Sequence, residues 1–360
     1  MARLLVYGAN GYTGELIARE AVRRGLAPVL AGRNADAIGR LSAELGCESR
    51  IARLDDAGSL VRMLAGVDAV LHCAGPFSMT AGPMMDACIA AGVHYFDVTG
   101  EIDVFEAAQR LDADARAAGA TVCPGVGFDV VATDCVAATL GAALPEATYL
   151  ALGFDSRSGV SAGTARSTVE GIGRGGRIRS SGRLVAVEHA FRVRDIDFGD
   201  GVRSAATIPW GDVSTAYRTT GIPNIEVYVP FTTGQVAAMR RLKYVLPFLR
   251  LGPVQAFLKS RAAARSPGPD AAARERTPTF VWGEAQAPGG ELVTARIRIG
   301  NLYDFTVHAA LGVATRVLAE KAAGGYRTPS QIVGARFVET LPGSGRLELA
   351  RGRAWEPGTA

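Results

Sequence analysis

The stretch GANGYTG (residues 8–14) decides how the rest of the chain is interpreted, because it places glycines at Gly8, Gly11 and Gly14. It follows the apolar run LLVY (residues 4–7) and precedes ELIAREAV, whose apolar residues have helical spacing. A phosphate-binding turn needs a tight backbone, no side chain where the anion approaches, and a helix N-terminus that offers free N–H groups. All three are present, although the usual dinucleotide fingerprint spaces its glycines two and then three apart. The stretch therefore predicts a pyrophosphate site; the alternative is a glycine-rich turn without a ligand.

Strand and helix patterns alternate through the first 125 residues. Short apolar strands are expected at 3–9, 28–33, 49–55, 68–75, 94–100 and 120–125, with helical patterns between them. Such alternation is typical of right-handed βαβ crossovers, so the predicted fold is α/β with a doubly wound parallel sheet. From about 146 to 304 the strands are longer and more alternating, which favours a second, mixed or antiparallel sheet. The stretch 261–276 is polar, small and broken by proline and glycine, and is expected to be a surface loop.

The end of the second strand selects the cofactor. NAD enzymes place an acid here to bind the ribose 2′-hydroxyl, whereas a 2′-phosphate needs a cation. This strand ends in Gly32, Arg33 and Asn34, and no acid appears before Asp36. Arg33 can pair with a phosphate in a bidentate manner. The sequence therefore favours NADP, with a solvated Arg33 as the alternative.

Two further strand ends should line the same edge, because ligands bind at the carboxyl ends of parallel strands. Asp55 or Asp56 could contact the adenine or cap the next helix, and Ala74, Gly75 and Pro76 should lie near the nicotinamide ribose. Phe77, Met79, Met84 and Met85 follow and suggest either helix core or an apolar pocket floor. The cofactor-binding residues assigned from the sequence are Gly8, Asn10, Gly11, Tyr12, Thr13, Gly14, Arg33, Asn34, Asp55, Ala74, Gly75 and Pro76.

The candidate proton donors are carboxylates. None of the nine tyrosines is followed by a lysine four positions later, so the short-chain dehydrogenase device is absent. Scattered histidines and lone cysteines predict no metal site. Asp129 and Glu101 follow the sixth and fifth strands and are the candidate catalytic residues, as acid or substrate-binding group; helix capping is the alternative for Asp129. Ser161 and Thr164 could donate hydrogen bonds to a substrate carbonyl.

Composition excludes several classes of protein. The net charge is only +4 and there is no dense Lys/Arg run, which argues against nucleic acid as a partner. Five cysteines without CxxC spacing indicate reduced thiols, and no signal peptide or membrane span is expected. We therefore expect a cytoplasmic protein.

Seven motifs together resemble the saccharopine dehydrogenase-like family, which includes saccharopine reductases and trans-acting enoyl reductases. They are GANGYTG, AGRN (31–34), HCAGPF (72–77), YFDVTGE (95–101), PGVGFDVVATD (124–134), SAGTARSTVE (161–170) and GGYRTPSQIVGARFVE (324–339). The resemblance implies an NADPH-binding Rossmann domain completed by C-terminal helices (1–130 and 305–350). It also implies an inserted α+β substrate domain (131–304), which often forms a homodimer.

The middle region bears on the substrate. Residues 222–258 are rich in Val, Leu, Phe and Pro and hold few cations, whereas a dicarboxylic amino acid would need several. The expected function is therefore NADPH-dependent reduction of a C=C, C=N or C=O bond on an apolar acyl, polyketide or lipid-like substrate. The alternatives are a non-catalytic NADP-binding sensor or lipid-associated scaffold, and a saccharopine-type amino-acid dehydrogenase. Segment 234–251 is basic and amphipathic, typical of a helix covering the sheet, a lid or a peripheral membrane contact.

Overall fold

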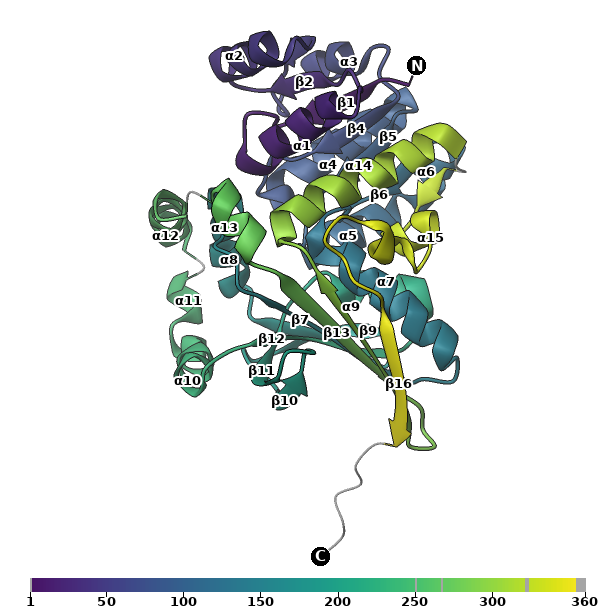
Figure 1. Ribbon diagram of the computed structural model, residues 1–360. Coiled ribbons are helices and arrows are strands. Elements are labelled where there is room, and N and C mark those ends of the chain that lie inside the picture. The colour runs from purple at the N-terminus through teal and green to yellow at the C-terminus, as the bar shows by residue number, and fades with distance from the viewer. Residues whose placement is uncertain (1, 250, 267, 321–323, 354–360) are drawn as a thin grey trace, which may run out of the picture.

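The chain is built around two β-sheets, one above the other in Figure 1. The structure is a computed structural model that describes residues 2–249, 251–266, 268–320 and 324–353. The upper sheet is parallel, with strand order β15-β6-β5-β4-β1-β2-β3. This order confirms the predicted doubly wound sheet. Its strands are β1 (Leu4–Tyr7), β2 (Val29–Gly32), β3 (Ser49–Ile51), β4 (Ala69–His72), β5 (His94–Asp97), β6 (Thr121–Cys123) and β15 (Gly325–Tyr326).

Helices cover both faces of this sheet. One face packs against α3, α4, α5 and α6, and the other against α1, α2 and α14, which comes from the far end of the chain. Met84 and Met85 are fully buried in the first of these cores, so they belong to helix packing and form no pocket floor. The helices are α1 (Tyr12–Arg23), α2 (Ala35–Leu45), α3 (Ala57–Leu64), α4 (Phe77–Ala91), α5 (Ile102–Arg110), α6 (Asp112–Ala117), α14 (Leu302–Glu320) and α15 (Pro329–Val333).

The second sheet is mixed, as expected. Its main path is β10-β11-β12-β7-β13-β14-β16, in which only β12 and β7 run parallel, and β8 and β9 extend it from β12. The strands are β7 (Tyr149–Ser156), β8 (Gly176–Ser180), β9 (Arg183–Val187), β10 (Val193–Asp197), β11 (Val202–Ile208), β12 (Asn224–Pro230), β13 (Thr279–Gln286), β14 (Glu291–Ile299) and β16 (Glu348–Arg353). The expected boundary at residue 350 thus lies inside β16, which pairs with β14 of this second sheet.

Helices α7 (Phe128–Ala143) and α9 (Asp212–Thr220) pack on one face of the second sheet. The same apolar core includes Phe305 and Ala309 of α14. Because α7 follows β6 of the upper sheet and packs on the lower sheet, it joins the two domains. Residues at the amino end of α7 are therefore held between the domains.

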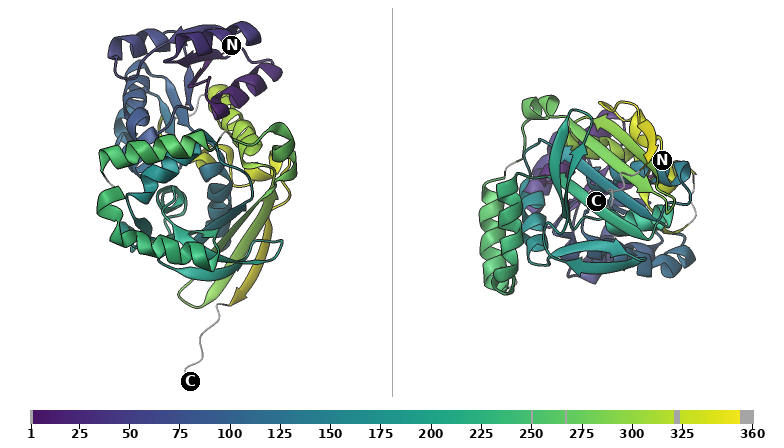
Figure 2. Two further views of the ribbon diagram at one scale, coloured as in Figure 1. Left: turned by 90° about the vertical axis from the view of Figure 1, so that its left-hand side faces the viewer. Right: turned by 90° about the horizontal axis from the view of Figure 1, so that it is seen from below.

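Further helices form the outer layer of the second domain. Helices α10, α11 and α12 lie one above another at the left of Figure 1 and face the viewer in the left view of Figure 2. Within 261–276 the expected loop is wrong, because α12 continues to Ala264 and α13 begins at Ala271, capped by the Asp270 side chain. The helices are α8 (Ala162–Ile172), α10 (Thr233–Arg241), α11 (Leu246–Leu249), α12 (Gly252–Ala264) and α13 (Ala271–Arg276).

Candidate active site

The glycine turn is shaped by close backbone approaches. Gly8 has φ +80°, and a Cβ there would lie 2.9 Å from the backbone nitrogen of Ala74. A Cβ at Gly14 would overlap the Gly8 carbonyl oxygen. Gly11 is the N-cap of α1, so no side chain caps the first turn of this helix. The turn therefore combines close strand–helix packing with a helix N-terminus open to an anion.

Arg33 lies just beyond β2 and is exposed. Within the residues that the structure describes, its guanidinium has no hydrogen-bond or ion-pair partner. Neighbouring Asn34 accepts from the Ala37 amide at 3.1 Å and thereby caps α2. A free cation at this position fits the 2′-phosphate of NADP.

The two acids after β3 have separate roles. Asp56 accepts a hydrogen bond from the Ser59 amide at 3.0 Å and is the N-cap of α3. Asp55 is exposed and pairs with Arg53, with 2.7 Å between carboxylate oxygen and guanidinium nitrogen. Its predicted contact with the cofactor stays a prediction.

The second domain reaches the glycine turn through Tyr12, a contact that the sequence did not predict. The Tyr12 hydroxyl donates to the Pro269 carbonyl oxygen at 2.5 Å and accepts from Arg274 Nη1 at 3.2 Å. The Tyr12 ring also meets the edge of Tyr303, with 4.9 Å between ring centroids. The segment before α13 therefore lies against the predicted pyrophosphate site.

Glu101 caps helix α4. Its carboxylate accepts from the backbone amides of Phe77 at 3.0 Å and Ser78 at 2.8 Å, directly after Pro76. Ser167 of α8 donates to the same carboxylate at 3.0 Å. The Glu101 side chain is thus already engaged by three donors, two of them at a helix N-terminus where a negative charge is favourable.

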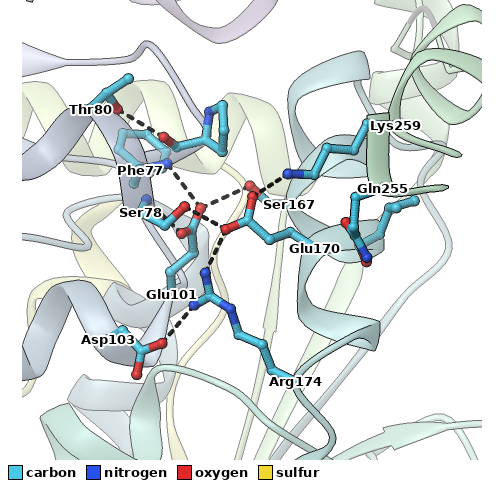
Figure 3. Close-up of polar contacts among 12 residues, drawn as sticks. Phe77, Ser78, Thr80, Glu101, Asp103, Ser167, Glu170, Arg174, Gln255 and Lys259 are labelled. Atoms are coloured by element: carbon cyan, nitrogen blue, oxygen red, sulfur yellow. Dashed lines mark hydrogen bonds and ion pairs between the residues drawn. The ribbon is translucent and has the colours of Figure 1, made fainter. Parts of the chain in front are cut away.

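An ion-pair network next to Glu101 connects the two domains (Figure 3). Glu170 of α8 accepts from the Ser78 hydroxyl at 2.5 Å and pairs with Lys259 and Arg174, each at 2.6 Å. Arg174 also pairs with Asp103 at 2.6 Å. These cations are neutralised by protein carboxylates.

Asp129 differs from Glu101. It is the second residue of α7, is half-buried, and in the described ranges its carboxyl group has no hydrogen-bond or ion-pair partner. A Cβ on Gly100 would lie 3.3 Å from Asp129 Oδ2, so the carboxyl group packs against the loop after β5. Burial, together with the nearby charges of Glu101 and Asp97, raises the pKa of Asp129 to about 7. Such a group can exist in both protonation states near neutral pH.

Asp97, the third acid at this edge of the sheet, is fully buried and holds together the loops that follow β5 and β6. It accepts from the Tyr95 hydroxyl at 2.6 Å and from the amides of Thr99 at 3.0 Å and Gly125 at 2.8 Å. Burial raises its pKa to about 6, although these hydrogen bonds oppose the shift. Its hydrogen bonds join the loops that carry Glu101 and Asp129.

Aromatic side chains lie beside Asp129. Trp210 Nε1 donates to the backbone oxygen of Asp129 at 2.7 Å. The Phe154 ring lies 5.2 Å from both Trp210 and Phe128, measured between ring centroids. Aromatic rings therefore lie beside the backbone at the start of α7, while the charges of Glu101 and Asp97 lie near the Asp129 carboxyl group.

Ser161 and Thr164, the other predicted donors, bond to each other and to Tyr303. Ser161 caps α8, with 3.1 Å between the two hydroxyl oxygens. The Ser161 amide donates to the Tyr303 hydroxyl at 2.5 Å. Their role toward a substrate carbonyl stays a prediction. Among the described residues, no group of three or more His, Cys, Asp or Glu side chains is placed to hold a metal ion.

A surface cavity of about 520 Å³ lies elsewhere, lined by Tyr149, Arg194, Tyr228 and Glu284 among others. These residues belong to the sheet face opposite α7. Arg194 and Glu284 form a bidentate pair at 2.9 and 3.0 Å, so the main charges of this cavity satisfy each other. The carboxyl edge of the upper sheet remains the better candidate site.

Comparison with known proteins identifies the class of the first domain. The family "Saccharopine dehydrogenase NADP binding domain" matches residues 4–123. Residues 4–123 are therefore similar to this family of NADP-binding domains, which confirms the resemblance seen in the sequence and the expected cofactor.

Particular relatives match the same share of the chain. A human saccharopine dehydrogenase-like oxidoreductase is 28% identical over 153 residues, which are 36% of this chain and 35% of that protein. A trans-acting enoyl reductase of Mycobacterium leprae is 30% identical over 139 residues, which are 36% of this chain and 33% of that protein. The chain thus aligns with about a third of the length of these relatives.

The whole fold also has a counterpart. Apo saccharopine dehydrogenase (L-Glu forming) from Saccharomyces cerevisiae superposes with a TM-score of 0.64 at 9% identity, covering 98% of this chain and all of that one. Both domains therefore follow the saccharopine dehydrogenase fold.

Proposed function

We propose that the protein is an NADPH-dependent oxidoreductase that reduces a C=C, C=N or C=O bond of an apolar substrate, with Asp129 as proton donor. The observation that carries the proposal is the half-buried Asp129 carboxyl group, which lacks a protein partner in the described part of the chain and has its pKa raised to about 7. It lies after β6, at the edge where open α/β sheets bind their ligands.

The residues present fit NADPH. The open N-terminus of α1 would hold the pyrophosphate, and the unpaired Arg33 would hold the 2′-phosphate. Ala74 and Gly75, which follow β4, would lie along the nicotinamide ribose. When bound, the cofactor supplies the hydride, so the protein must orient the acceptor and provide a proton.

Asp129 is better suited than Glu101 to provide that proton. Glu101 is engaged by Phe77, Ser78 and Ser167, whereas the carboxyl group of Asp129 is free to meet a substrate. A pKa near the working pH favours general acid catalysis. Glu101 is then a positioning residue that fixes the start of α4.

The surroundings favour an apolar substrate. Trp210 binds the backbone oxygen of Asp129 and packs on Phe154, whereas the nearby cations Arg174 and Lys259 are paired with Asp103 and Glu170. A dicarboxylic amino acid would need unpaired cations. The aromatic side chains and the lack of unpaired cations at Arg174 and Lys259 therefore favour an acyl, polyketide or lipid-like substrate over an amino acid.

An NADPH oxidation assay with enoyl, imine and ketone substrates tests the proposal. We expect turnover of at least one apolar substrate and its loss in Asp129→Asn, with NADPH binding retained. Binding of NADPH without turnover over the whole panel would instead favour a non-catalytic sensor or scaffold. Light scattering of the same samples tests the expected homodimer.

A further inference from the structure

The outer helix layer, which we define as α10, α11 and α12 with the described residues between them (233–249 and 251–264), lies in a part of the sequence with an unusual charge. The sequence from 231 to 269 contains no Asp or Glu. Its seven basic residues are Arg240, Arg241, Lys243, Arg250, Lys259, Arg261 and Arg265. Lys243 and Lys259 pair with Glu188 and Glu170 outside the segment. Among the described residues, Arg240, Arg241, Arg261 and Arg265 have no carboxylate partner, and they form a local concentration of positive charge on a chain whose net charge is only +4.

Large apolar side chains of the same layer face solvent. Tyr244 is 73% exposed, Phe248 66% and Phe257 63%, and Leu251 is 52% exposed. Single exposed apolar residues are common on protein surfaces, but a group of aromatic and aliphatic residues within fourteen positions is not (Tyr244 to Phe257). The outer helix layer therefore combines exposed apolar groups with cations.

The inner side of this layer is firmly attached to the second domain. Gln255 donates to the carbonyl oxygen of Val169 in α8 at 3.4 Å, and Lys259 pairs with Glu170 of the same helix at 2.6 Å. Val236 of α10 is buried against Ala190 and Ala206. The helices therefore already have a packed inner side, and the exposed Phe248 and Phe257 are not needed for it.

We propose that the outer helix layer docks on an anionic lipid bilayer, with its aromatic side chains in the interface and its cations at the headgroups. Interfacial helices bind by this combination of buried apolar area and attraction to anionic lipids. A second copy of the chain fits less well, because a symmetric contact would place the exposed arginines of two copies against each other. None of the helices in the described ranges has the length and apolar character needed to cross a bilayer, so docking would be peripheral.

The docked layer would lie next to the candidate site. Lys259 of α12 binds Glu170, which also accepts from Ser78 at the start of α4. Bilayer docking does not depend on the proposed chemistry, however, and is measured without a substrate.

Vesicle sedimentation of the full chain tests the docking. We expect binding to phosphatidylcholine vesicles that contain phosphatidylglycerol, weaker binding to pure phosphatidylcholine, and loss of binding as salt is raised. The double variant Phe248→Asp/Phe257→Asp should bind about tenfold or more weakly. Arg241→Glu/Arg261→Glu should lose the preference for the anionic lipid.

The matched control is Val202→Asp, which changes a 63% exposed apolar residue on β11. It should bind vesicles like the wild type, and all variants should bind NADPH, which shows that they fold. Equal vesicle binding by the wild type and the double aspartate variant, or no binding to anionic vesicles at all, would overturn the proposal. The proposal would also be overturned if light scattering showed a dimeric wild type and a monomeric Phe248→Asp/Phe257→Asp variant while the wild type did not bind vesicles.

Discussion

The carboxylate of Glu101 accepts a hydrogen bond from the backbone amide of Ser78 at 2.8 Å, across 23 residues of sequence. A second bond from the Phe77 amide completes the cap of α4. This fixes the helix start that follows Ala74, Gly75 and Pro76, the segment predicted to line the cofactor. Two carboxylates that look alike in the sequence, Glu101 and Asp129, thus have different surroundings.

Glu101→Ala should therefore act mainly on stability. Loss of a helix cap costs about 0.5–2 kcal/mol of the free energy of unfolding, and the Ser167 hydroxyl also loses its acceptor. We expect a lower midpoint in thermal denaturation with partial activity remaining. Glu101→Gln keeps one acceptor oxygen, so its denaturation midpoint should lie between those of the wild type and Glu101→Ala. An unchanged midpoint together with abolished turnover would show instead that Glu101 is catalytic.

Asp129→Asn should abolish proton donation. The expected loss of kcat is about 10²–10⁴-fold, with the Kd for NADPH unchanged. Asp114→Asn, which removes an exposed carboxylate on α6 outside the candidate site, is the matched control and should retain turnover. Retention of wild-type kcat in Asp129→Asn would exclude Asp129 as the donor.

The pH dependence of kcat should follow the titration of the Asp129 carboxyl group. Because its pKa is raised to about 7, the carboxyl group is protonated below that pH and loses its proton above it. An acid must be protonated to donate, so kcat should fall about tenfold per pH unit above pH 7. A rate that is flat from pH 6 to pH 9, with chemistry rate-limiting, would contradict the assignment.

Gly14→Ala tests the packing of the glycine turn. The added Cβ would overlap the Gly8 carbonyl oxygen, so we expect a cost of about 1–3 kcal/mol and weaker NADPH binding. Gly39→Ala is the control, because a Cβ at this helical position meets nothing within 4 Å. It should leave stability unchanged or raise it by up to about 1 kcal/mol. Equal effects of the two substitutions would show that the close approach at Gly14 is unimportant.

Asp212 should make stability depend on pH. Both of its carboxyl oxygens are buried, and this burial raises its pKa well above the usual value although the Thr133 side chain opposes the shift. The folded state therefore holds a proton that the unfolded chain releases near pH 4. Stability should fall as pH rises above that value, and Asp212→Asn should flatten the fall in denaturant titrations between pH 5 and pH 9. A slope that is identical in wild type and variant would contradict this.

The fold of the first domain could be predicted because its signals are local. The glycine turn, the short apolar strands and the Asp56 cap of α3 all depend on neighbouring residues. The position of Arg33 is also a local property, because this residue directly follows the end of β2. Its contact with the 2′-phosphate stays a prediction. Local periodicity could not separate helix core from pocket floor for Met84 and Met85, because both give an apolar helix face.

Contacts between distant segments could not be predicted. Tyr12 meets Pro269 and Arg274 across more than 250 residues, and Lys259 reaches Glu170 from a helix that the sequence pattern does not pair with α8. The different roles of Glu101 and Asp129 also depend on such contacts, since both follow strand ends. The helix α13 was missed because its small and polar residues resemble a loop.

Calorimetric titration with NADPH and NADH tests the central claim most directly, namely that the open end of α1 and the unpaired Arg33 together bind NADPH. The wild type should bind NADPH at least about tenfold more tightly than NADH, since a charge-assisted phosphate contact contributes about 1.5–3 kcal/mol. Arg33→Ala should lose this preference while its affinity for NADH stays the same. No heat with NADPH, or a clear preference of the wild type for NADH, would contradict the account.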